Sequence, residues 1–114
     1  MGRSIFFNII FGILFFFSGT NAFAVDAYTL PQGGQITQGE VVIHNPSLGV
    51  LNVDQISNSA SIEWNTFNVG EEASVHFNQP TDTARIYNNV LNGTSSIYGK
   101  VFANGKLFLH IYNC

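Results

Sequence analysis

The sequence contains very little cysteine: among its 114 residues the only one is Cys114, at the last position. A disulfide needs two cysteines and a thiolate zinc site needs at least two, so the chain can form neither within itself. A small domain without such a cross-link must be held together by its apolar core.

Positive charge is also scarce. The chain has 4 lysines and arginines against 7 aspartates and glutamates, a net charge of −3, and removal of residues 1–24 takes Arg3 away and makes the net charge −4. Proteins that bind nucleic acid or anionic membrane surfaces gather lysine and arginine into a patch that contacts phosphates. We therefore expect neither nucleic-acid binding nor stable membrane insertion from this chain.

Apolar residues are concentrated at the start of the chain, where 7 of the 11 phenylalanines lie within the first 24 residues. Arg3 is followed by the apolar run Ile5–Phe17 and then by Ala22-Phe23-Ala24. This order predicts a secretory signal peptide over residues 1–24, cleaved after Ala24 or alternatively after Ala27. The run would span only about 20 Å as a helix, whereas the apolar core of a bilayer is roughly 30 Å thick.

After residue 24, apolar residues do not recur at helical spacing, and short stretches of alternating apolar and polar residues occur instead. Glycine, proline and asparagine residues, which favour turns, separate them. The alternating stretches are Val41–Ile43, Val50–Val53, Ile62–Trp64, Ser74–Phe77, Ala84–Tyr87, Lys100–Phe102 and Lys106–Ile111. They predict an all-β domain, either a sandwich or a solenoid of stacked turns. The abundant asparagines favour the solenoid, because asparagine tolerates left-handed backbone angles at corners and stacks its amide on neighbours.

The segment "IEWNTFNVGEEASVHFNQP", residues 62–80, contains the clearest strand patterns. Alternation places Ile62 and Trp64 on one side of a strand, and the same pattern returns in "VHF". We therefore expect one core to contain Trp64, Phe67, Val75 and Phe77. The backbone and amide groups of this segment are expected to form a surface to which a partner adds a strand.

Residue types that carry catalysis or bind metals are present but scattered. His44, His76 and His110 each lie between apolar neighbours in an expected strand, where an outward-facing, solvated imidazole is more usual than a metal ligand. Glu71 and Glu72 are adjacent in a turn, so their carboxylates are expected to diverge into water rather than act as an acid–base pair. The sequence therefore predicts no catalytic site, no metal site and no cofactor.

Three stretches carry a family resemblance: "LPQGGQITQGEVVI" (30–43), "LNVDQISNSASIEWNTFNVGEEASVHFNQP" (51–80) and "IYNNVLNGTSSIYGKVFANGKLFLHI" (86–111). They contain, in order, the motifs W-x-x-F-N-V-G, V-x-F-N-Q-P, S-I-Y-G and A-N-G-K-L-F-L. In this series the chain resembles the secretion domain at the front of filamentous-haemagglutinin-like exoproteins, also called the haemagglutination activity domain, of two-partner secretion systems in Gram-negative bacteria. The resemblance covers nearly all of a domain spanning residues 25–114.

The resemblance implies a right-handed parallel β-helix whose N-terminal segment folds over the first turn as a cap. It also implies a secretion-targeting role in an adhesin, in which the periplasmic POTRA domains of a TpsB-type outer-membrane barrel transporter recognise the domain and export it to the cell surface. The motifs Asn78-Gln79-Pro80 and Asn104-Gly105 match the family pattern and are the candidate partner-binding residues. Alternatively, these residues only close turns of the solenoid.

The sequence departs from the family pattern after "LFL", where members continue with an Ile-Asn-Pro-Asn-Gly type turn and this sequence has "HIYNC". We therefore expect the domain to be C-terminally incomplete, with the edges of its last turn exposed. In the family, contact with host-cell glycans belongs to the passenger region that follows this domain. A second interpretation is a carbohydrate-binding adhesin module in which Trp64 or Tyr87 contacts the sugar.

Overall fold

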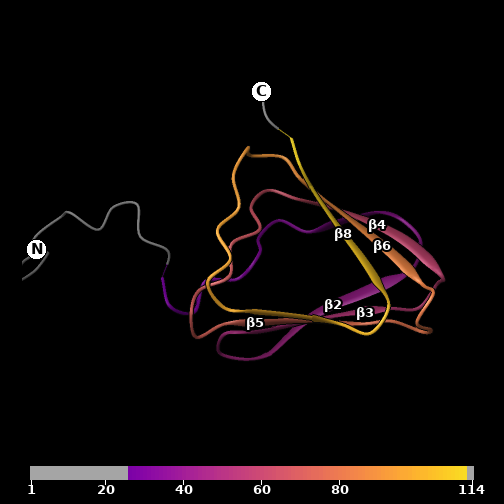
Figure 1. Cartoon of the computed structure of the whole chain (residues 1–114), viewed down its shortest axis with the longest axis horizontal. Helices are drawn as coiled ribbons and strands as arrows, with labels where there is room; N and C mark the ends of the chain where they lie inside the picture. The colour runs from indigo at the N-terminus through magenta and orange to yellow at the C-terminus, as the bar shows by residue number, and fades with distance from the viewer. Residues whose placement is uncertain (1–25, 113–114) are drawn as a thin grey trace, which may run out of the picture.

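The computed structural model describes residues 26–112, so the expected signal peptide and Cys114 lie outside the described residues. The described part is built of β-strands, as the sequence predicts (Figure 1). No helix in the described range is long and apolar enough to cross a membrane. The strands are β1 (Gln35–Gln38), β2 (Val41–Ser47), β3 (Val50–Gln55), β4 (Ser59–Trp64), β5 (Ser74–Asn78), β6 (Arg85–Val90), β7 (Lys100–Ala103) and β8 (Lys106–Ile111).

The strands form two four-stranded sheets, in the order β1-β4-β6-β8 and β2-β3-β5-β7. From β3 to β8, consecutive strands alternate between the two sheets, and within each sheet they pair in parallel. The chain therefore coils, and each turn lies on the one before it, as the view along the coil shows (Figure 1). A sandwich of antiparallel sheets, the other arrangement that the strand spacing allowed, is not what the chain forms.

The first two strands pair differently from the rest. β1 is antiparallel to β4, and β2 is antiparallel to β3, so this N-terminal segment lies over the first turn on both sheets. Leu30, Val41 and Ile43 of the segment pack against the core. The alternation pattern did not predict β1, because "QITQ" has one apolar residue and all four of its side chains are exposed.

The core lies between the sheets and contains the four residues expected there, Trp64, Phe67, Val75 and Phe77, each with no more than 2% of its surface exposed. The Trp64 and Phe67 rings meet edge to face at 5.6 Å, and Phe67 stacks on Phe77 at 6.4 Å. A buried indole N–H without a partner would cost about 1–3 kcal/mol. Here the Trp64 Nε1 donates to Oδ1 of the buried Asn88 at 2.9 Å. Trp64 is thus unable to contact a sugar, which corrects one half of the carbohydrate-binding interpretation.

Two motif glycines allow close backbone contacts at one corner of the coil. A Cβ on Gly70 would lie 2.2 Å from the carbonyl oxygen of Asp26, and a Cβ on Gly99 would lie 2.2 Å from the carbonyl oxygen of Gly70. Real Cβ atoms do not approach backbone oxygens this closely. The glycines of W-x-x-F-N-V-G and S-I-Y-G therefore let the N-terminal segment and the following turn pack against the same corner.

Candidate partner-binding site

The two motifs nominated from the sequence meet at one corner of the coil, which we call the amide corner: Gln55, Gln79, Asn104 and Gly105. Gln79 is 7% exposed, and its Nε2 donates to Oε1 of Gln55 at 3.0 Å. The same amide nitrogen lies 3.2 Å from the carbonyl oxygens of Ala84 and Lys106. Gln55 is buried as well, so the two amides form a ladder across successive turns.

Asn104 and Gly105 complete the amide corner from the next turn. The backbone N–H of Gln79 donates to Oδ1 of Asn104 at 2.7 Å, and Nδ2 of Asn104 donates back to the Gln79 carbonyl at 2.8 Å. Gly105 N donates to Oε1 of Gln79 at 2.9 Å. These bonds satisfy polar groups that would otherwise be left unpaired where the chain changes direction. The geometry fits the turn-closing alternative, while Asn104 and Pro80 stay exposed at the surface.

Asn78, the remaining nominated residue, belongs to a polar row on the outer face of the second sheet, made of His44 (β2), Asp54 (β3) and Asn78 (β5). Nε2 of His44 lies 2.9 Å from Oδ2 of Asp54, and Nδ2 of Asn78 donates to Oδ1 of Asp54 at 2.7 Å. The hydrogen bond from Asn78 holds the pKa of Asp54 below its ordinary value of 3.8; burial opposes this shift and His44 adds to it. The row ties three neighbouring strands together.

The expectation that residues 62–80 offer backbone for strand addition is wrong. β4 lies between β1 and β6, and β5 lies between β3 and β7, so both strands are paired on both sides. Within residues 26–112, the strands with a free side are β1, β2, β7 and β8. A partner that adds a strand must therefore bind at one of these four.

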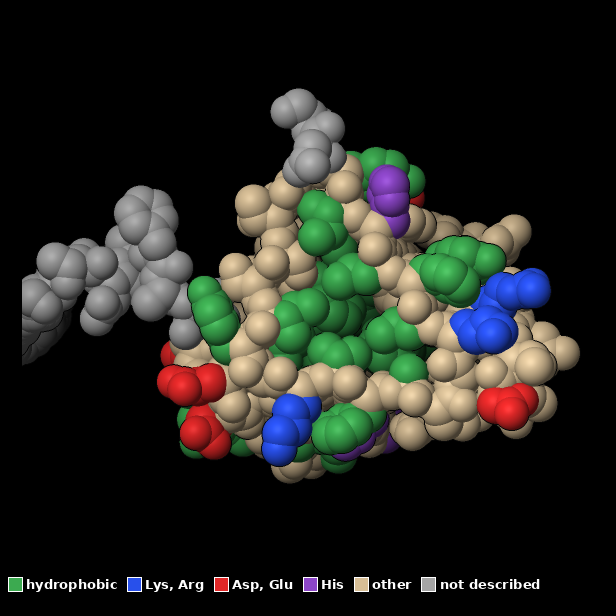
Figure 2. Space-filling model, viewed as in Figure 1, with side chains coloured by type: hydrophobic (Ala, Val, Ile, Leu, Met, Phe, Trp, Pro, Cys, Tyr) green, Lys and Arg blue, Asp and Glu red, His purple; other side chains and the backbone are tan. Residues whose placement is uncertain are grey.

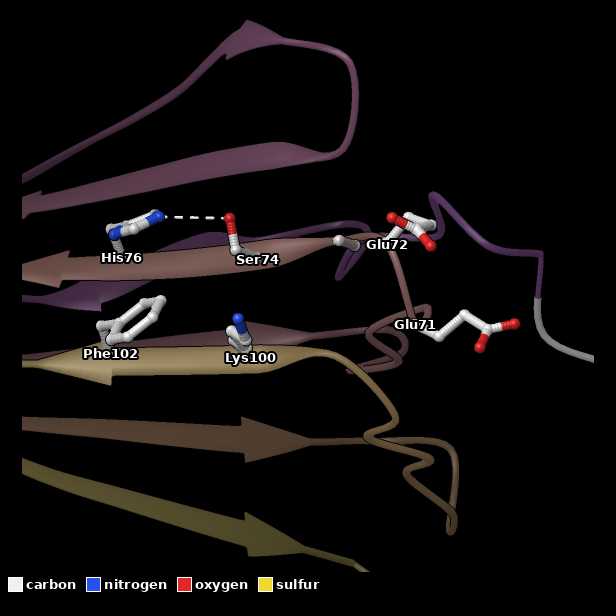
Figure 3. Close-up of a pocket in the computed structure, with 7 residues that line it drawn as sticks. Glu71, Glu72, Ser74, His76, Lys100 and Phe102 are labelled. Carbon is white, nitrogen blue, oxygen red and sulfur yellow. Dashed lines mark hydrogen bonds between the residues drawn. The ribbon is translucent and has the colours of Figure 1, made fainter.

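A surface hollow of about 330 Å³ lies near the start of β5 and β7 and is lined by Glu71, Glu72, Ala73, Ser74, His76, Lys100 and Phe102 (Figure 3). Nε2 of His76 lies 3.1 Å from Oγ of Ser74, and the imidazole stacks on the Phe102 ring at 4.9 Å. The side chains of Glu71 and Glu72 diverge and point away from His76 (Figure 3). Nucleophilic catalysis needs a base that a third group orients, and no described carboxylate contacts the His76 ring.

The histidines do not gather. His44 contacts Asp54, His76 contacts Ser74 and Phe102, and His110 lies against Tyr112 with the ring centroids 4.5 Å apart. His44 and His110 are exposed, as expected, and His76 is half-buried. In the described range 26–112, no group of three or more histidine, cysteine, aspartate or glutamate residues could hold a metal ion.

The end of the coil that carries β7 and β8 is apolar, in line with the expectation that the edges of the last turn are exposed. Figure 2 shows hydrophobic side chains in the middle of this face, framed by backbone and with charged side chains at the rim. Val101, Leu107 and Ile111 are only half-buried against the core, and Leu109 is exposed. Within residues 26–112, no segment covers these side chains.

Comparisons with known proteins point to one family. A family model described as "TPS secretion domain" matches residues 27–113. The heme/hemopexin-binding protein of Haemophilus influenzae is 38% identical over 80 residues, which cover 69% of this chain and 9% of that protein. The protein of the same name from H. influenzae strain ATCC 51907 / DSM 11121 / KW20 / Rd is 35% identical over 91 residues, 79% of this chain and 10% of that protein.

Among solved structures, the HMW1 secretion domain from Haemophilus influenzae is similar to this chain with a TM-score of 0.63 and 24% sequence identity. The likeness covers 69% of this chain and 21% of that one, and it concerns the fold. The chain thus spans about a tenth of the length of the two curated relatives that it matches.

Proposed function

Because the chain belongs to the TPS secretion domain family, we propose that it directs an adhesin-like or haemagglutinin-like exoprotein to a TpsB-type outer-membrane transporter. The family is a secretion-domain family of exoproteins and not an enzyme family. In the proposed route, residues 1–24 act as a signal peptide into the periplasm, and the transporter's POTRA domains bind residues 25–114 before export to the cell surface. The match over residues 27–113 carries the proposal.

We also propose that the two sheets belong to a right-handed parallel β-helix with an N-terminal cap. Parallel pairing between every second strand and the antiparallel β1 and β2 over the first turn support this architecture. The named ligands of the relatives belong to proteins about ten times the length of the matched segment. We therefore do not assign a heme site to this domain.

The proposed mode of recognition is addition of a POTRA strand to the free side of β2. β2 is the longest strand described, with 7 residues, and its regular part, Val41 to His44, pairs with β3 on one side only, so a partner strand can add to its other side. Val42 and Leu48 are 50% and 74% exposed beside this edge and supply apolar anchors. β2 also lies at the N-terminal end of its sheet, so turns added beyond β7 would not cover it.

In this proposal the binding surface begins at β2 and ends at the candidate residues nominated from the sequence, Asn78, Gln79, Pro80, Asn104 and Gly105. The polar row leads from β2 to Asn78, and exposed Pro80 and Asn104 continue it onto the amide corner. Gln79 and Gly105 contribute indirectly, since they hold the corner in place. Asn104→Ala separates the two roles: a binding role lowers affinity for POTRA domains beyond any loss of thermal stability, whereas a turn-closing role lowers stability alone.

The direct test is binding of purified residues 25–114 to the periplasmic domains of the cognate transporter, measured by calorimetry. Val42→Lys is expected to weaken binding about tenfold or more, equivalent to about 1.4 kcal/mol, because it places a charge in the apolar anchor. Ile36→Lys on β1 is the matched control, since Ile36 is 42% exposed on the edge strand of the other sheet. Absence of binding by correctly folded protein would refute the proposal, and equal losses in the two variants would refute the choice of β2.

A further inference from the structure

The outer face of the first sheet gathers two cations and two aromatic rings into one patch. On β6, the outward side chains of Arg85 and Tyr87 alternate with buried Ile86 and Asn88. β8 runs parallel to β6 in a register that places Lys106 beside Arg85 and Phe108 beside Tyr87. We call these four residues, Arg85, Tyr87, Lys106 and Phe108, the cation–ring patch.

The cations of this patch have no anionic partner in the described part of the chain. The ion pair found within residues 26–112 joins His44 to Asp54 on the other sheet, and no carboxylate lies within 4.0 Å of Arg85 or Lys106. Like charges on directly neighbouring strands destabilise a sheet. An anion held between Arg85 and Lys106 would remove this repulsion. The repulsion between the two cations therefore favours the binding of an anionic ligand.

The rings stand two residues further along the same strands. Tyr87 and Phe108 stack with their centroids 4.9 Å apart and their planes 13° from parallel, and they remain 38% and 44% exposed. The exposed edge of an aromatic ring carries partial positive charge and attracts anionic groups, whereas the C–H groups of a ligand pack against the negative face of a ring. A ligand with anionic groups and C–H-rich surfaces can therefore contact the cations and the exposed parts of the rings side by side.

We propose that the cation–ring patch binds an anionic polysaccharide that carries carboxylate groups. A peptide is less suited to this face, because the backbone groups of β6 are paired with β4 and β8, and the free backbone groups of β8 point along the plane of the sheet rather than out of this face. A sugar chain needs only side-chain partners: guanidinium and ammonium groups for its carboxylates, and rings for its C–H groups. Two cations on a chain of net negative charge are too few for a nucleic-acid backbone.

This site is separate from β2, so its test is independent of the transporter. The probe is an oligogalacturonate, which has one carboxylate per sugar, titrated calorimetrically into residues 25–114 at low ionic strength. Neutral dextran of equal length and poly-glutamate of equal charge serve as comparison ligands. We expect the oligogalacturonate to bind, dextran not to bind, and affinity to fall as salt screens the exposed charges.

Matched variants locate the site. Arg85→Gln and Lys106→Gln should each weaken oligogalacturonate binding about fivefold, the loss expected for one exposed charge contact. Lys100→Gln removes the same charge from the other sheet and should leave affinity unchanged. Phe108→Leu keeps an apolar side chain but should weaken sugar binding, with Trp64 fluorescence reporting that each variant is folded.

Three outcomes would overturn the proposal. The first is no binding of oligogalacturonate by the folded protein. The second is an equal loss for Lys100→Gln and Lys106→Gln, which would reveal non-specific attraction. The third is poly-glutamate binding as tightly as the sugar with no effect of Phe108→Leu, which would assign the patch to acidic peptides instead.

Discussion

The two ends of the coil differ within the described residues, because one is covered by a segment of different pairing and the other is open. At the N-terminal end, antiparallel β1 and β2 lie over the first turn, and Leu30, Val41 and Ile43 of this segment pack against the core. At the other end, the parallel strands β7 and β8 leave Leu109 and its neighbours open within the described residues. A stack of parallel turns does not seal itself, and it needs a segment with a different pairing direction to close an end.

The largest effect is expected when the N-terminal segment that covers the first turn, residues 25–47, is removed. Deletion of residues 25–47 takes away β1, β2 and the apolar side chains packed beneath them, so β3 and β4 become edges and the core opens at both ends. We expect loss of cooperative thermal unfolding, followed by circular dichroism and Trp64 fluorescence. A deletion variant that still unfolds in one sharp transition would show that the first turn does not need its cover.

A smaller effect is expected from Gly70→Ala, which loosens the cover without removing it. The added Cβ would meet the backbone oxygens of Asp26 and Ala27 at 2.2 and 2.4 Å, and overpacking of this kind costs about 1–3 kcal/mol. Urea unfolding measures the loss. Ala73→Gly at the same corner is the control, because it adds no atom, and a stability loss for Gly70→Ala no larger than for this control would contradict the assigned contact.

Substitution at the open end should change association more than stability. Leu109→Ser alters a side chain that is already 38% exposed, so we expect a change in unfolding free energy within about 1 kcal/mol. Self-association, measured by light scattering, should decrease because the apolar face becomes smaller. Ile62→Ser, at a fully buried position of the same sheet, should instead unfold the protein.

The smallest effect concerns pH and the polar row. Because the pKa of Asp54 is lower in the folded chain than its ordinary value of 3.8, this carboxylate contributes stability above that value. The contribution is lost as the pH falls through the lowered folded pKa. The side chain of Asp54 is 41% exposed, so the effect should be small. Asn78→Ala should flatten the acid limb of the stability curve, and an unchanged curve would remove Asn78 as the cause.

Sequence alone predicted the all-β class, seven of the eight strands and the buried side of "IEWNTF", because alternation depends only on neighbouring residues. β1 was missed, since a covering strand with one apolar residue resembles a loop. Gln79 and Asn104, which belong to the two motifs nominated from the sequence, lie together in the structure. The hydrogen bonds that join them depend on the register between turns, which the motifs do not give.

The register itself could not be derived from the sequence. Parallel partners begin 24 residues apart in β3 and β5, 26 apart in β4 and β6, and 21 apart in β6 and β8, so no fixed repeat is visible. For this reason the proximity of Arg85 to Lys106, and of Tyr87 to Phe108, is visible only in the structure. Because the pairing of the strands was unknown, residues 62–80 were also wrongly expected to offer free backbone to a partner strand.

The parallel ladders also bear on how the chain would fold during the proposed export through a transporter. The strands β5, β6, β7 and β8 each pair with a strand of the turn directly before. The side chain of Gln79 donates to the Lys106 carbonyl and accepts from Gly105 N of the turn directly after. Assembly therefore requires only the most recent segment and the one arriving, never a distant part of the polypeptide. Folding turn by turn in this way is compatible with the proposed export, in which one end of the chain would emerge before the other.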